Sequence, residues 1–114
     1  MTTNQVSRDG ILTAFASYGC SKENYLIGGE YERAIVRPNG MPINYDEPYG
    51  VRWFLNQFSS RWGWKPKLEG KNIIALTKDG ASITLEPGGQ FELSGKPHRN
   101  LRTLVEEFSL NRDN

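Results

Sequence analysis

The segment Leu85 to Gly95, LEPGGQFELSG, constrains the fold more than any other part of this chain. Apolar and polar side chains alternate on both sides of Pro87-Gly88-Gly89, and such alternation is typical of half-buried β-strands. A proline followed by two glycines is typical of a tight turn. The segment therefore predicts an antiparallel hairpin with one apolar face and one polar face.

The polar face of this hairpin carries two carboxylates and an amide, from Glu86, Gln90 and Glu92. Two carboxylates placed close together on one face repel each other unless a cation lies between them. Oxygen ligands without nitrogen or sulfur suit a hard cation such as Mg2+ or Mn2+. The hairpin is thus a candidate half of a metal site, and the alternative is a half-exposed hairpin whose polar face is only solvated.

A second acidic pair lies upstream, in the stretch LIGGEYERA. Glu30 and Glu32 are two residues apart, so they share one face of a predicted strand. Gly28 has the same parity and leaves room beside them, as glycines often do where a ligand or another segment comes close. The alternative is a surface strand whose glutamates pair with Arg33 or a nearby lysine.

Together these stretches resemble the N-terminal region of glutamate-cysteine ligase of the plant and proteobacterial type. The resemblance extends from about residue 19 to residue 107, through GCSKENYLIGGEYE and then EGKNIIALTKDGASITLEPGGQFELSGKP, followed by a segment rich in Leu and Glu. LEPGGQFELSG is nearly a signature of this ligase and its close carboxylate-amine ligase relatives. The family usually reads Gly-Thr-Glu-His-Glu where this chain has Gly28-Gly29-Glu30-Tyr31-Glu32, so both glutamates are kept.

The resemblance implies an enzyme that uses ATP to phosphorylate the γ-carboxylate of glutamate. The amine of cysteine then displaces phosphate to give γ-glutamylcysteine, the first step towards glutathione. The resemblance also implies Mg2+, or Mn2+, held by Glu30, Glu32, Glu86 and Glu92. Gln90 would hydrogen-bond near the cofactor, and Arg33 would balance charge or touch a phosphate. It identifies no catalytic residue.

The fold class that the resemblance implies is α+β, a mostly antiparallel sheet with flanking helices. It would be part of a glutamine synthetase-like carboxylate-amine ligase catalytic domain. Because 114 residues bound one small domain, we expect residues 1–114 to form a single partial domain, the N-terminal part of that catalytic domain. Glutamate, cysteine, ATP and the remainder of the ligase chain are the expected partners, and the chain alone is expected to be inactive.

Two other functions fit the same residues. One is a related carboxylate-amine ligase with a different amine acceptor, because the acceptor pocket is expected to lie largely outside the hairpin. The other is a non-catalytic module that keeps the metal- or nucleotide-binding face. A charge of +1, from 14 basic and 13 acidic residues, gives no basic stripe, so nucleic acid is not an expected partner.

A membrane is also not an expected partner, because no apolar stretch of the sequence approaches the roughly 20 residues that span a bilayer. The first residues lack the charged and apolar pattern of a signal peptide. From these two features we expect a cytosolic location.

Helical periodicity predicts helices at about residues 7–18, 46–63 and 100–110. The middle helix has the clearest apolar stripe, which must pack on the sheet. Strands are predicted from Glu30 towards Val36, from Asn72 to Leu76 and from Ala81 into the hairpin. His98, the single histidine, lacks a partner His or Cys and is expected at a helix entry rather than on a metal.

Overall fold

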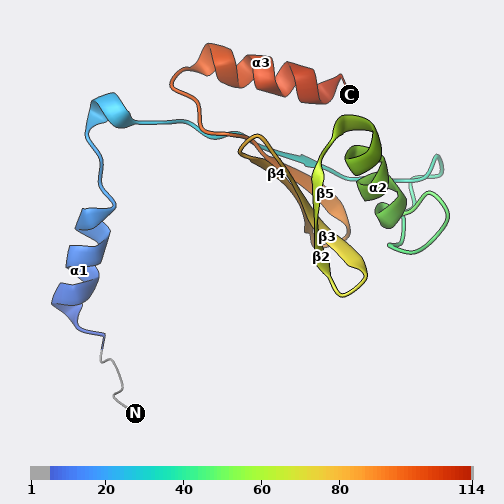
Figure 1. Ribbon diagram of the computed structural model, residues 1–114, viewed down its shortest axis with the longest axis horizontal. Helices are drawn as coiled ribbons and strands as arrows, with labels where there is room; N and C mark the ends of the chain where they lie inside the picture. Colours follow the sequence, from blue (N-terminus) through green and yellow to red (C-terminus); the bar gives the residue numbers. More distant parts are fainter. Residues whose placement is uncertain (1–5, 114) are drawn as a thin grey trace.

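The computed structural model describes residues 6–113 and shows one antiparallel sheet with helices (Figure 1). The elements in chain order are α1 Arg8–Ser17, the short 3-10 helix η1 Lys22–Asn24, β1 Glu30–Arg33, α2 Val51–Trp62, β2 Lys65–Glu69, β3 Asn72–Lys78, β4 Ala81–Glu86, β5 Gln90–Ser94 and α3 Leu101–Arg112. The predicted α+β class, with a mostly antiparallel sheet and flanking helices, is confirmed.

The five strands lie in the order β1-β5-β4-β3-β2, and every neighbouring pair is antiparallel. The predicted hairpin is formed by β4 and β5, with Ile83 opposite Leu93 and Glu86 opposite Gln90. Gly88 and Gly89 have backbone φ angles of 81° and 74°, which residues other than glycine rarely adopt. This requirement explains why the turn needs both glycines.

Helix α2 packs on one face of the sheet, as its apolar stripe predicts. Leu55 of α2 and Leu76 of β3 are both fully buried, and each such side chain contributes about 1.5–3 kcal/mol by leaving water. The helix begins at Val51, later than the predicted 46–48, because residues 47–50 form a turn closed by a 2.8 Å bond from Gly50 N to Glu47 O. It ends at Gly63 in a left-handed conformation, with φ of 71°.

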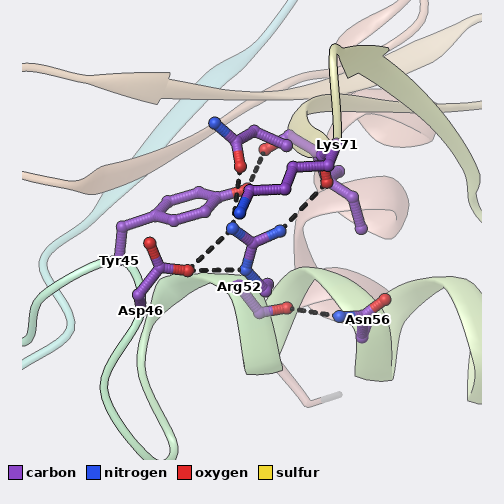
Figure 2. Close-up of polar contacts among 7 residues, drawn as sticks. Tyr45, Asp46, Arg52, Asn56 and Lys71 are labelled. Atoms are coloured by element: carbon purple, nitrogen blue, oxygen red, sulfur yellow. Dashed lines mark hydrogen bonds and ion pairs between the residues drawn. The ribbon is translucent and has the colours of Figure 1, made fainter.

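Strand β2 is absent from the sequence prediction and is tied to α2 through one arginine. The guanidinium of Arg52 donates to Lys71 O at 3.0 Å and to Asn72 Oδ1 at 2.7 Å, at the turn that joins β2 to β3 (Figure 2). It also bonds Asp46 and lies 4.7 Å from the centre of the Tyr45 ring. These contacts fix the first turn of α2 to the end of the β2–β3 hairpin.

Helix α3 begins at Leu101, because Asn100 caps its N-terminus. The Asn100 side chain accepts a 3.0 Å hydrogen bond from Thr103 N. It covers the same face of the sheet as α2, since the Phe108 ring lies 4.8 Å from that of Tyr31 on β1. Strand β1 is shorter than predicted, because Val36 pairs with Pro42 in an isolated bridge instead of continuing the sheet.

Helix α1 stands apart from the sheet (Figure 1). It has no buried residue, although Ser7 caps it through a 3.0 Å bond from Gly10 N to its hydroxyl. The radius of gyration of 18.7 Å exceeds the value of about 13 Å typical of a compact chain of this length. The difference reflects this extended arm. Within the described residues, none of the helices combines the length and apolar character needed to cross a bilayer.

Candidate metal-binding face

The strand register gives the sheet two chemically different faces. Directly paired residues of neighbouring strands share a face. The helix-covered face carries Tyr31, Leu93, Ile83 and Leu76, one from each of four strands. The opposite face, called here the polar face, carries the alternate residues of the same strands.

All four glutamates predicted as metal ligands lie on the polar face. Glu32 of β1 is directly opposite Glu92 of β5, and Glu30 is opposite Ser94. Glu86 is opposite Gln90, which makes it a diagonal neighbour of Glu92 at about 7–8 Å. The register therefore brings the two acidic pairs of the sequence together on three neighbouring strands.

The carboxylates share a face without forming a closed ligand cluster. Within residues 6–113, no group of three or more His, Cys, Asp or Glu side chains is close enough to hold a metal ion. Glu30 and Glu32 are exposed, whereas Glu86 and Glu92 are half-buried. None of the ion pairs formed between described residues includes any of the four, so they are not balanced by a neighbouring cation.

The donor set on this face consists of oxygen atoms. Besides the carboxylates it includes the Ser94 hydroxyl, which donates a 3.3 Å bond to Glu92 Oε1, and the amide oxygen of Gln90. The Gln90 Nε2 group donates to Pro87 O at 3.4 Å, within the turn. Like charges directly opposite, as in Glu32 and Glu92, are unfavourable unless a cation joins them. The chemistry of these donors therefore suits a hard divalent cation, although the described side chains do not form a closed ligand cluster.

The structure does not bring Arg33 together with the four glutamates. Arg33 is opposite Phe91, on the helix-covered face, and its Nη2 donates to Asn111 O at the end of α3 at 2.8 Å. It therefore balances the negative end of a helix dipole. The alternation that unites Glu30 and Glu32 already puts residue 33 on the other face, and this signal was present in the sequence.

Tyr31 also lies on the helix-covered face. In sequence it stands between Glu30 and Glu32, but its side chain is on the opposite side of the sheet from theirs. Burial raises the pKa of its phenol, and the nearby negative charge of Glu107 raises it further. A Cβ on Gly29 would lie 2.5 Å from the Tyr31 hydroxyl, so the glycine provides the space for this tyrosine. Both departures from the usual family sequence thus belong to packing against α3.

Sequence reasoning missed the polar contacts around Glu107 of α3. The Glu107 carboxylate, 12% exposed, accepts a 3.1 Å bond from Lys96 N and lies 3.1 Å from Nε2 of His98. The latter contact is at ion-pair distance without hydrogen-bond geometry, and both atoms are buried. His98 is thus a helix-entry residue, as expected, and no local sequence signal links it to Glu107.

The fold and the face together define a small α+β unit with helices on one side of its sheet and carboxylates on the other. Comparison with known proteins finds relatives that are named as ligases. The chain is 38% identical over 111 residues to glutamate-cysteine ligases of Brassica juncea and Arabidopsis thaliana, and 41% identical over 100 residues to ligase A of Oryza sativa subsp. japonica. It is therefore a homologue of the plant glutamate-cysteine ligases, which confirms the resemblance read from the sequence.

The match covers 96% of this chain for the first two relatives and 86% for the third, but only 20–21% of their own lengths. The chain thus spans about one fifth of the length of these relatives. No family model matches it. All three relatives are chloroplastic by name, and this finding contradicts the cytosolic location expected from the sequence. The lack of a long apolar stretch and of a signal-peptide pattern was an unsound basis for that expectation.

Proposed function

We propose that this chain is one part of an ATP-dependent ligase that joins the γ-carboxylate of glutamate to the amine of cysteine through an acyl phosphate. The observation that carries the proposal is the common face of Glu30, Glu32, Glu86 and Glu92, within the stretch homologous to the ligases. The sheet would form the N-terminal part of a glutamine synthetase-like catalytic domain.

The four glutamates would hold Mg2+ or Mn2+, with Gln90 beside them. The metal, when bound, neutralises phosphate charge and orients the nucleotide. The residues of this chain then have two tasks. The carboxylates fix the position of the cation on a rigid sheet, and the Ser94 hydroxyl orients the Glu92 carboxylate through its 3.3 Å hydrogen bond.

The remainder of a ligase chain would supply the substrate pockets and the groups that touch the reacting atoms. In the described residues, the polar face of the sheet is not covered by a helix, since α2 and α3 pack on the other face. We therefore expect residues 1–114 alone to bind metal and nucleotide weakly and to form no γ-glutamylcysteine.

Titration of the purified chain with Mn2+, with and without ATP, tests the metal site by calorimetry. We expect weak binding that Glu92→Gln and Glu86→Gln reduce, since each variant removes one negative ligand. Glu106→Gln is the matched control, because Glu106 is an exposed residue of α3, away from the polar face. Equal binding by all three variants, in chains shown to be folded by circular dichroism, would refute this assignment.

A second function, a ligase with another amine acceptor, fits the same residues. None of the described contacts of the hairpin defines an acceptor pocket, because its polar side chains bond only to each other and to the turn. Adding the chain to a complementing ligase fragment and supplying different amines, with phosphate release as the readout, would separate the two ligases. A non-catalytic module would bind Mn2+ and ATP but would not restore activity with any of the amines.

A further inference from the structure

The positive charges of the sheet divide between its two faces. The strands contain four cationic residues, which are Arg33, Lys65, Lys67 and Lys78. Arg33 donates to Asn111 O and Lys78 donates to Trp62 O, each at the C-terminal end of a helix on the helix-covered face. Lys65 and Lys67 remain as the strand cations of the polar face.

The register aligns these two lysines with the glutamates in two rows that cross all five strands. From β1 to β2, the first row is Glu30, Ser94, Ser82, Thr77 and Lys65, and the second row is Glu32, Glu92, Thr84, Ala75 and Lys67. Each row begins with a carboxylate and ends with an ammonium group. Along these two rows the charge therefore changes from negative at the β1 edge to positive at the β2 edge, while Glu69, the last residue of β2, adds one carboxylate to that strand.

The separation between the two ends suits a ligand that extends across the sheet. Glu92 and Lys67 are three strands apart, about 14 Å between backbones. The residues between them in the second row are Thr84 and Ala75, which are short and leave the surface low. Within residues 6–113, neither lysine ammonium has a hydrogen-bond or ion-pair partner, and both side chains are exposed.

We propose that Lys65 and Lys67 bind the phosphates of a polyphosphate anion whose metal ion lies at the glutamates. The inference rests on the proposed function and assigns to these lysines the charge balance that the resemblance implied for Arg33. A lysine ammonium is a compact donor that binds phosphate as a point charge. The anion is thus drawn to the β2 side, away from the repulsion of the four carboxylates.

Edge protection is the competing explanation, because lysines on an edge strand also discourage pairing with another chain. Strand β2 has two further features of this kind, Pro66 and a register shift between Lys67 and Leu68. Edge protection predicts that removing the lysines promotes self-association without changing phosphate binding. The two explanations therefore differ in a measurable quantity.

The test is calorimetric titration of the chain with inorganic tripolyphosphate, in the presence and absence of Mn2+. We expect Lys65→Gln and Lys67→Gln each to weaken binding roughly two- to fivefold, with a larger loss in the double variant. Lys22→Gln is the control for net charge, since this exposed lysine lies in η1, outside the sheet. Sedimentation velocity on the same samples measures self-association.

Three outcomes would overturn the inference. These are no measurable tripolyphosphate binding by the unmodified chain, an equal effect of all three single variants, or self-association of the sheet variants with unchanged binding. Titration with Mn2+ alone reports on the glutamates separately. If the unmodified chain binds no tripolyphosphate but keeps Glu92-dependent Mn2+ binding, the role of the lysines is refuted and the proposed metal site still stands.

Discussion

The carboxylate of Glu107 lies 3.1 Å from the imidazole of His98, and both groups are buried between α3 and the segment that enters it. The other Glu107 oxygen accepts the 3.1 Å bond from Lys96 N. Through these contacts α3 is fixed to the segment after β5. The same helix contacts β1, the strand that carries Glu30 and Glu32, through the rings of Tyr31 and Phe108.

We expect Glu107→Gln to lower the free energy of unfolding by about 1–3 kcal/mol, because it replaces the buried carboxylate that lies 3.1 Å from His98 Nε2 with a neutral amide. The measurement is urea denaturation followed by circular dichroism. Glu106→Gln, at the exposed neighbouring position, should change the stability by less than about 0.5 kcal/mol. An equal effect of both substitutions would show that the His98 contact does not stabilise the fold.

Gly95→Ala should destabilise the chain by about 1–3 kcal/mol, because overpacking displaces neighbouring groups. An alanine Cβ there would lie 2.1 Å from Glu107 Oε2 and 2.9 Å from Glu107 Cδ. Gly28→Ala is the matched control, since a Cβ at that position meets no atom within 4 Å. Denaturation midpoints that move equally for both variants would contradict the close approach of Glu107 to the backbone.

Stability should fall at alkaline pH because of Tyr31. Its pKa is raised in the folded state by burial and then by the charge of Glu107, so between the unfolded value near 10 and the higher folded value only the unfolded chain releases the proton. The contribution is complete below about pH 10 and is lost as the pH rises through the folded pKa.

Tyr31→Phe removes this ionisation, so the free energy of unfolding should depend less on pH above about 10 than in the unmodified chain. Tyr25→Phe serves as the control at an exposed tyrosine, 61% accessible. Denaturation curves at a series of pH values provide the comparison. Identical pH profiles for the Tyr31 variant and the unmodified chain would exclude this source of alkaline sensitivity.

Arg52→Ala should lower the free energy of unfolding by about 1–3 kcal/mol, because it removes charged donors from Lys71 O and Asn72 Oδ1 (Figure 2). Arg61→Ala, an exposed position near the end of the same helix, is the control. Hydrogen exchange at the β2–β3 turn should accelerate in the first variant only. Unchanged exchange there would mean that the arginine does not hold the turn.

The hairpin and α2 could be predicted from sequence because each has a strong local signal. Alternation around Pro87-Gly88-Gly89 fixed the strand parity, and the apolar spacing along α2 fixed the buried side. Strand β2, with the sequence KPKLE and all five residues exposed, has no such signal. It is a strand only because β3 pairs with it, and pairing between segments is not a local property.

The candidate site shows the same limit. Parity within each strand predicted that Glu30 matches Glu32 and that Glu86 matches Glu92, but only the order β1-β5-β4 brings the two pairs side by side. The resemblance implied a role for Arg33 beside the cofactor, although the parity of Arg33 opposes that of Glu32. The lysines of β2 could not be considered before that strand was known.

Because the sheet has a helix-covered face and a polar face, selection for stability and selection for ligand binding act on different residues of one short segment. In Leu85 to Gly95, substitutions at Phe91 and Leu93 alter the packing under the helices, whereas those at Gln90 and Glu92 alter the opposite surface. A library randomised at the first pair would be sorted by thermal resistance, and one randomised at the second pair by ligand capture. Adjacent codons of the same hairpin can therefore diverge independently.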